Sequence, residues 1–419
     1  MGNDSATAGV LLMVVMLVGI VGMVAKLKGS ATPRETPPAP THTFRVFTLG
    51  VSGAGKTCFM ASLYSRLKSV RISTGFYLRV SPEHHTKLTD LYAKISNPEA
   101  EWPAGTSNDR EWVFSLRVPS RRNNESFHAF DFTYLDYAGG HLKDADKAAA
   151  LRAHEKVADA HAVLVLIDGL KILRRLARSE DRDPRERLGA DLDVLMPYLN
   201  DTGTKPVHIV LTKWDLLANQ YGLTHVRDCL MAHPDFKDFV AMRSDRGIPT
   251  RLIPISAVGL NFVTINHLGQ MVKATDVNPV PLHVEVSRAA TLSDAFETVV
   301  SQMTQAERSA IHALAHGTAV DRSKAWAWLV STASSMLSRL PFPVSVVGQV
   351  GPYIRDYLLQ RHQTPEDLDK QYRAAMQSVT DRESAIRTVL ASHKHLLRSF
   401  EVQYPESLLA SGNLEKLAG

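Results

Sequence analysis

The sequence has few cysteines and no dense cluster of charge of either sign. Two cysteines, Cys58 and Cys229, stand among 419 residues. That number excludes a disulfide-stabilised secreted scaffold and fits a reducing compartment. The net charge is +5, and the 48 Lys and Arg residues are scattered along the chain. We therefore expect no nucleic-acid partner, and the mildly basic balance fits either attraction to anionic lipid or an ordinary solvated surface.

Long uncharged runs are also rare, and the one that stands out lies at the N-terminus. Residues 8–25 (AGVLLMVVMLVGIVGMVA) carry no charge, and a helix of that length crosses about 27 Å at about 1.5 Å per residue. Asp4 precedes the run, whereas Lys26 and Lys28 follow it, which places the C-terminal flank in the cytosol. We expect residues 1–28 to form a single-pass membrane anchor with its N-terminus outside, rather than a cleaved signal peptide.

A phosphate-binding motif follows a Pro-rich linker, residues 29–43, and a short β-prone run, residues 44–49. Residues 50–57 (GVSGAGKT) satisfy G-x-x-x-x-G-K-[ST] and lead into an amphipathic helical pattern. Glycines at the N-terminus of a helix let backbone N–H groups surround a phosphate. Lys56 would bridge the β- and γ-phosphates, and Thr57 would ligate Mg²⁺. The predicted nucleotide-binding residues of this loop are Gly50, Ser52, Gly53, Ala54, Gly55, Lys56, Thr57 and Cys58.

A second motif ends the predicted strand at residues 127–135 (FHAFDFTYL), which runs into DYAG. Asp136, at the end of that strand, can hold Mg²⁺ through water. Gly139 can donate its backbone N–H to the γ-phosphate. Such a motif carries weight here because it follows both a strand and a phosphate loop.

Two further motifs indicate that the base of the nucleotide is guanine. The strand at residues 207–211 runs into TKWD, Thr212 to Asp215. The Asp215 carboxylate can accept the N1–H and the exocyclic N–H of guanine, while the aliphatic stem of Lys213 lies over the ring. The strand at residues 252–255 precedes Ser256 and Ala257, where a backbone N–H can meet the guanine O6.

The motif order GVSGAGKT, DYAG, TKWD and SA resembles the Ras-like and translation-factor class of P-loop GTPases, over about residues 44–260. The resemblance implies an α/β three-layer sandwich with a mostly parallel sheet, binding of GTP or GDP with Mg²⁺, and a two-state switch. Thr212 departs from the Asn that is commonest there. The layout of one anchor before a small GTPase is similar to the signal recognition particle receptor β subunit, whose partner is not carried over.

The class also places a switch-loop threonine on Mg²⁺, and two candidates exist. Residues 111–118 form the predicted strand that pairs with residues 127–135, and Thr106 lies five residues ahead of it, as the class requires. Thr106 is therefore favoured over Thr74, with residues 75–101 as an insertion. The predicted metal ligands are thus Thr57, Thr106 and Asp136.

The residue that should orient the attacking water is missing from its usual place. The class commonly has Gln after the motif glycine, whereas this chain has Gly140, followed by His141. A neutral imidazole can accept a hydrogen bond from water, so the predicted catalytic residues are His141, Thr106 and Gly139. We expect a GTPase with slow intrinsic hydrolysis and a protein partner that supplies the missing group.

Another central strand is predicted at residues 161–169, with Asp168 as a turn residue. From residue 289 to 419 the pattern is helical, which predicts an α-helical C-terminal domain after a GTPase domain of residues 44–288. Thr364 begins a helix that would run past Leu390. Residues 325–340 are interpreted as a core helix, with a membrane-interfacial helix as the alternative.

These observations favour a membrane-anchored, GTP-hydrolysing switch on the cytosolic face that recruits or regulates an unknown protein effector. A nucleotide-stabilised membrane scaffold with little hydrolysis is the second hypothesis. A P-loop ATPase subunit is the third, and Asp215 argues against it.

Overall fold

The computed structural model describes most of the chain between residues 43 and 410, in the ranges 43–71, 74–105, 109–120, 125–137, 140, 147–181, 183–301 and 364–410. These residues belong to one compact unit. Within them, no helix combines the length and the apolar character that crossing a bilayer requires. The predicted anchor at residues 8–25 and the stretch at residues 325–340 lie outside the described residues.

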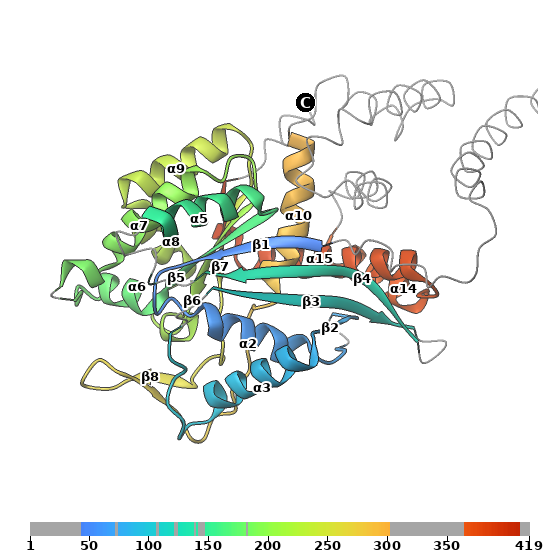
Figure 1. The fold of residues 1–419 in the computed structure, drawn as a ribbon, viewed down its shortest axis with the longest axis horizontal. Helices are drawn as coiled ribbons and strands as arrows, with labels where there is room; N and C mark the ends of the chain where they lie inside the picture. Colours follow the sequence, from blue (N-terminus) through green and yellow to red (C-terminus); the bar gives the residue numbers. More distant parts are fainter. Residues whose placement is uncertain are drawn as a thin grey trace, which may run out of the picture. The chain divides into compact units, whose positions relative to one another are not determined.

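A sheet of eight strands forms the centre of this unit, in the order β10-β7-β6-β5-β1-β4-β3-β2 (Figure 1). Its parallel central strands are β1 (Thr43–Leu49), β4 (Ser126–Asp136), β5 (Ala162–Asp168), β6 (Val207–Thr212) and β7 (Thr250–Pro254). Antiparallel strands extend both edges, namely β3 (Arg110–Pro119), β2 (Tyr77–Arg79) and β10 (Leu408–Ala410). The predicted α/β fold with a mostly parallel sheet is confirmed.

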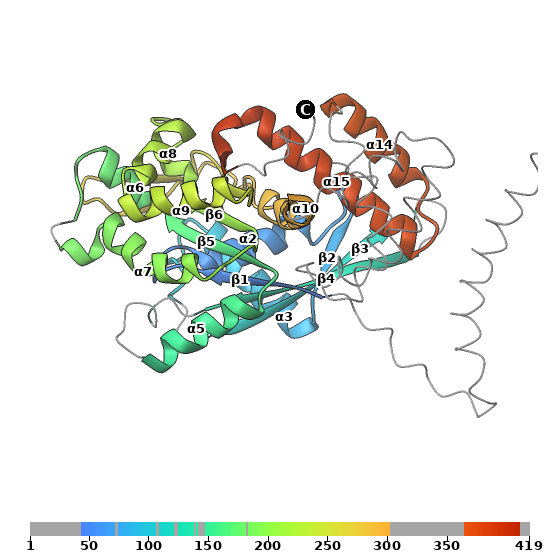
Figure 2. The same cartoon turned by 90° about the horizontal axis from the view of Figure 1, so that it is seen from above.

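Helices cover both faces of the sheet, and each face has its own hydrophobic core. Successive strand residues point to opposite faces, so Phe44 and Val46 of β1 enter one core and Phe47 and Leu49 the other. The first core includes α2 (Lys56–Leu67), α3 (Pro82–Ser96), α10 (Val286–Ser301) and α15 (Arg382–Gln403). The second includes α5 (Lys147–Asp159), α6 (Gly169–Leu176), α7 (Leu188–Asn200), α8 (Leu223–Met231) and α9 (Pro234–Asp245). Figure 2 shows α5 and α15 on opposite sides of the sheet.

The insertion between α2 and β3 contributes one strand and one helix. β2 pairs antiparallel with β3 and so extends the sheet, while α3 packs on α2. Ser81 caps α3 by accepting a hydrogen bond from the backbone N–H of His84, and Pro82 occupies the first turn, where its missing N–H costs nothing.

The C-terminal residues share the core of the sheet. The predicted boundary between residues 288 and 289 falls inside α10, α15 packs on β4, and β10 pairs with β7. Thr364 caps α14 (Pro365–Gln377) as predicted. The expectation of one helix running past Leu390 is wrong, because α14 ends at Gln377.

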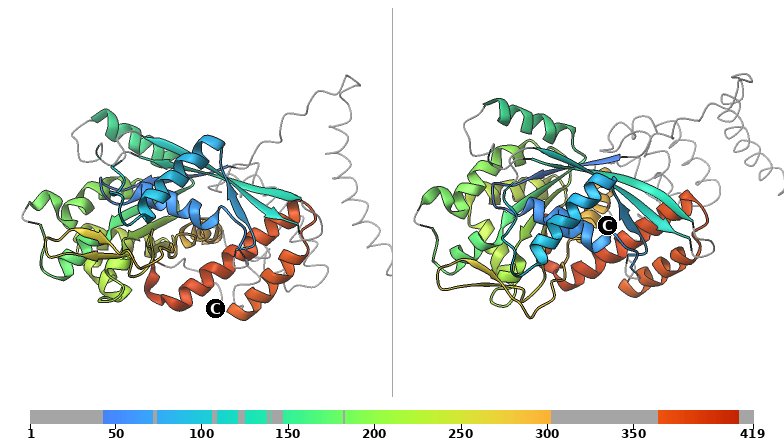
Figure 3. Two further views of the ribbon diagram at one scale, coloured as in Figure 1. Left: turned by 90° about the horizontal axis from the view of Figure 1, so that it is seen from below. Right: turned by 60° about the horizontal axis from the view of Figure 1, so that its bottom comes forward.

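A new helix, α15, follows this break. Asp381 caps it in a reciprocal capping box with Ser384, which begins a second helix at that point. Figure 3 shows α14 and α15 side by side, in red.

Candidate functional site

The phosphate loop leaves β1 and closes onto the first turn of α2. Gly53 and Gly55 have φ values of +82° and +86°, which residues other than glycine rarely adopt. Lys56 is buried, and its ammonium donates to the carbonyls of Gly50 at 2.5 Å and Val51 at 3.4 Å. Burial lowers the pKa of Lys56, while the negative charges of Asp136 and Asp109 act in the opposite direction. A phosphate bound in the loop would place further negative charge beside the Lys56 ammonium.

The two predicted metal ligands that the structure describes lie together. Thr57 at the start of α2 and Asp136 at the end of β4 bring Oγ1 and Oδ2 to 3.3 Å. They meet because β1 and β4 are adjacent parallel strands, with Thr48 opposite Asp136. A hydroxyl and a carboxylate are hard oxygen ligands of the kind that Mg²⁺ takes beside nucleotide phosphates. The donor set therefore fits Mg²⁺.

Thr212, at the end of β6, joins the base-binding region to the phosphate loop. Its hydroxyl lies 2.9 Å from the carbonyl of Ala54 and 3.1 Å from that of Ile167. The threonine hydroxyl thus lies between the phosphate loop and the end of β5 and shares its one proton between the two backbone carbonyls. The departure from the commonest residue of the class has a structural role here.

Lys213 follows with a left-handed backbone, at a φ of 54°. Its ammonium lies 2.7 Å from Asp168 Oδ2, and the other oxygen of Asp168 accepts from the N–H of Leu170 at 2.9 Å. Asp168 therefore caps α6 and fixes the Lys213 head, which is more than the turn role the sequence suggested. The register of β5 and β6 places Asp168 opposite Thr212, next to Lys213. In the sequence, the indication of this pair is that Asp168 ends a predicted strand, as TKWD does.

Asp215 is buried at the other end of the site, and burial raises its pKa to about 6. A hydrogen bond with Ser256 and the charge of Lys213 act to lower that pKa. Ser256 Oγ also accepts from the N–H groups of Val258 at 3.2 Å and Gly259 at 2.8 Å. The loops after β6 and β7 are thus locked together around the carboxylate.

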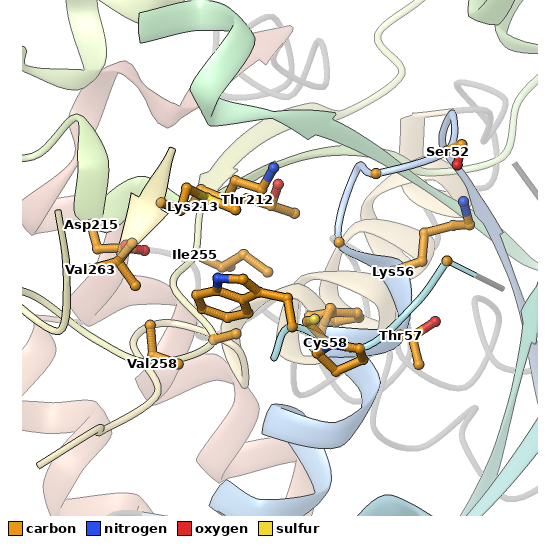
Figure 4. A pocket seen from close by; sticks show the side chains of 18 of the residues that line it. Ser52, Lys56, Thr57, Cys58, Thr212, Lys213, Asp215, Ile255, Val258 and Val263 are labelled. Atoms are coloured by element: carbon orange, nitrogen blue, oxygen red, sulfur yellow. The ribbon is translucent and has the colours of Figure 1, made fainter. Parts of the chain in front are cut away.

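A cavity of about 320 Å³ joins these parts. Figure 4 shows Ser52, Lys56 and Thr57 on one side of it and Lys213 and Asp215 on the other. The predicted residues that line it are Ser52, Gly53, Gly55, Lys56, Thr57, Cys58, Thr212, Lys213, Asp215 and Ala257. A cavity of this size is within the range of small-molecule sites.

The structure describes residues next to the predicted catalytic residues, but not the catalytic residues themselves. Thr106, Gly139 and His141 lie outside the described residues, and Gly140 is exposed. Gly105, the neighbour of Thr106, lines the cavity, and a Cβ added to it would lie 3.5 Å from Ser52 Oγ. The role of Thr106 as a metal ligand stays a prediction.

Thr74, the other candidate for the switch threonine, is buried away from the cavity lining. Its hydroxyl donates to the carbonyl of Phe76 at 3.2 Å, and its own carbonyl accepts from Ser392 on α15. Thr74 thus belongs to the packing between the insertion and the C-terminal helices.

Sequence reasoning missed several residues of the cavity wall, among them Trp102 and Met271. It also missed Asp109, which is close enough to act on the charge of Lys56. Trp102 lies only four residues ahead of the favoured switch threonine. Its position close to Thr106 was the feature of the sequence that could have identified Trp102 as a cavity residue.

A protein-family model described as Double-GTPase 2 matches residues 46–243. None of the curated proteins compared with the chain matches it. The matched range contains the phosphate loop, DYAG and TKWD, and ends before Ser256. Together with the sheet and the motif geometry, the match indicates a P-loop GTPase domain in this part of the chain.

Proposed function

We propose that this chain is a GTP-hydrolysing molecular switch, held on the cytosolic face of a membrane by residues 8–25, that recruits or regulates a protein partner. One observation carries the nucleotide part of the proposal. A single cavity is lined by Thr57 at one end, whose hydroxyl lies 3.3 Å from Asp136, and by the buried Asp215 at the other. A carboxylate selects guanine, which offers two N–H donors on one edge, over adenine, whose N1 is an acceptor.

Each residue has a distinct part in binding. Lys56 turns its ammonium from the loop carbonyls towards the β- and γ-phosphates, while loop N–H groups hold the β-phosphate. Thr57 and Asp136 hold Mg²⁺, with Thr106 as the third protein group; Mg²⁺ neutralises phosphate charge when bound. Lys213 lays its stem against the base, with its head held by Asp168.

Hydrolysis needs a group that positions water beside the γ-phosphate. Gly140 has no side chain, and His141 is the nearest candidate, with Gly139 N–H as a donor to the phosphate. We therefore assign slow turnover to the isolated protein and a faster rate to its complex with a partner. A purely scaffolding role is the alternative if no partner accelerates it.

Asp215→Asn tests the base assignment. The amide offers an N–H where guanine has one too, whereas xanthine has a carbonyl at that position. The variant should lose about tenfold or more in GTP affinity and gain affinity for xanthosine triphosphate. Competition titrations against a fluorescent nucleotide measure both, with exposed Asp193→Asn as the matched control. Unchanged GTP preference in Asp215→Asn, or ATP competing as well as GTP in the wild type, overturns the assignment.

A further inference from the structure

Lys273 is a buried lysine that none of the nucleotide motifs contains. It ends β9 (Met271–Lys273), which forms a hairpin with β8 (Val263–Ile265), and only 8% of it is exposed. Its ammonium lies 2.7 Å from the carbonyl of Lys94, 3.0 Å from that of Asn97 and 2.9 Å from that of Ala100. An ammonium has three donors, so each is used.

The three carbonyls lie at the end of α3 and in the turn that follows it. A helix C-terminus presents unpaired carbonyls and the negative end of its dipole. A buried cation there is favourable, and it also fixes the direction in which the chain leaves α3. The contacts join segments about 175 residues apart in sequence, since the separations are 179, 176 and 173.

The segment fixed in this way runs along the nucleotide cavity. We call residues 97–105 the covering loop. Its residues Trp102, Pro103, Ala104 and Gly105 line the cavity, and the Lys273 ammonium lies 4.4 Å from the centre of the Trp102 ring, within cation–π distance. At Gly105 the covering loop lies next to Ser52 of the phosphate loop. It therefore extends from the Lys273 contact to the phosphate loop.

The hairpin that carries Lys273 follows the base-binding loop in the chain, and the residues after the hairpin return to that loop. Val280 N–H donates to the carbonyl of Val258 at 2.9 Å, and Ala274 N–H donates to that of Phe262 at 2.8 Å. Val263 and Met271 of the hairpin line the same cavity. Lys273 thus connects the hairpin, whose residues Val263 and Met271 line the cavity, with the covering loop.

We propose that Lys273 is a positioning residue that latches the covering loop over the nucleotide and slows nucleotide release. The proposal rests on the proposed function in that the cavity takes a guanine nucleotide. Lifting the loop breaks the charge-assisted hydrogen bonds to the carbonyls of Asn97 and Ala100 and the cation–π contact with Trp102. The same latch sets the position from which the chain enters Thr106.

The test measures release of a fluorescent N-methylanthraniloyl-GDP from the purified full chain after addition of excess unlabelled GDP. Lys273→Met keeps the length of the side chain and removes the charge. It should raise the dissociation rate constant about tenfold or more, the effect of losing a buried charged hydrogen bond, with little change in the association rate constant. Lys94→Met is the matched control, because it removes an exposed charge nearby and leaves the Lys94 carbonyl in place.

Two further variants keep the result interpretable. Lys273→Arg keeps the charge, but its planar fork cannot aim at three converging carbonyls, so release should be faster than in the wild type and slower than in Lys273→Met. If Lys273→Met does not fold, the release rate of Lys273→Arg relative to the wild type tests the proposal. In the double variant with Trp102→Phe, the effects should be less than additive because the two side chains touch.

The latch and the nucleotide assignment fail in different ways. If the wild type binds no guanine nucleotide, the proposed function fails. Acrylamide quenching of nucleotide-free protein then still reports on the latch, because Lys273→Met should increase the quenching of Trp102, isolated by subtracting Trp102→Phe. If the wild type binds but both Lys273 variants release nucleotide at the wild-type rate, the latch is overturned.

Discussion

At the scale of the residue, the buried carboxylate of Asp215 makes base recognition depend on pH. Burial raises its pKa to about 6, and only the ionised form accepts the two guanine N–H groups. As the pH falls below about 6, protonation competes with guanine, so GDP affinity should drop about tenfold per pH unit. Fluorescence titrations from pH 5 to pH 8 measure this. Asp215→Asn cannot titrate there and should lack this component; identical profiles for both proteins contradict the prediction.

Gly140 governs the expected rate of hydrolysis. It is exposed and carries no side chain to orient water. The purified chain should therefore turn over on the order of 10⁻⁴ s⁻¹ or more slowly, as unassisted Ras does. Single-turnover release of phosphate measures the rate. Turnover above about 0.1 s⁻¹ by the protein alone means that a complete water-positioning site is present in cis.

At the scale of the element, a buried ionic network attaches α10 to the sheet. Asp294 on α10 lies 3.1 Å from His208 Nε2 on β6 and 2.7 Å from Arg251 Nε on β7. The other side of the Arg251 guanidinium lies 2.7 Å from Glu401 on α15. One side chain of α10 thus connects two strands and, through Arg251, the C-terminal helix.

Asp294→Ala should lower the free energy of unfolding by about 3–5 kcal/mol, because it leaves the Arg251 charge buried without its main partner. Chemical denaturation followed by circular dichroism measures the loss. Asp193→Ala is the control, since Asp193 pairs with His233 at an exposed position, where an ion pair contributes less than about 1 kcal/mol. Equal losses for the two variants would show that the Asp294 network adds nothing to stability.

At the scale of the whole molecule, the proposed attachment to the membrane is assigned to residues 8–25, which lie outside the described residues. Removing residues 1–28 should move most of the protein from the membrane pellet to the supernatant after ultracentrifugation, because it deletes the whole uncharged run. Mutation of Lys56 to Ala in the full chain should leave the protein in the pellet. A truncated chain that stays in the pellet would favour the interfacial interpretation of residues 325–340.

The central strands of the sheet and the order of the nucleotide loops along the chain follow from the sequence alone. The strand at residues 207–211 was predicted within one residue of β6, and Thr364 was identified as the cap of α14. These features depend on neighbouring residues: alternation along a strand, glycines in a tight loop, a hydroxyl before a proline. Thr57 and Asp136 meet because carboxyl ends of parallel strands share one edge of the sheet.

Features that depend on residues far apart in the chain became visible in the three-dimensional structure. The pairing of Lys213 with Asp168, the three carbonyls around Lys273 and the addition of β10 to the sheet each join segments that are distant in the sequence. The C-terminal helices were predicted as a domain of their own because helical periodicity shows which face is apolar but not what that face packs against. The apolar faces of α10 and α15 are instead buried on the sheet that carries the nucleotide site, since that burial removes both surfaces from water.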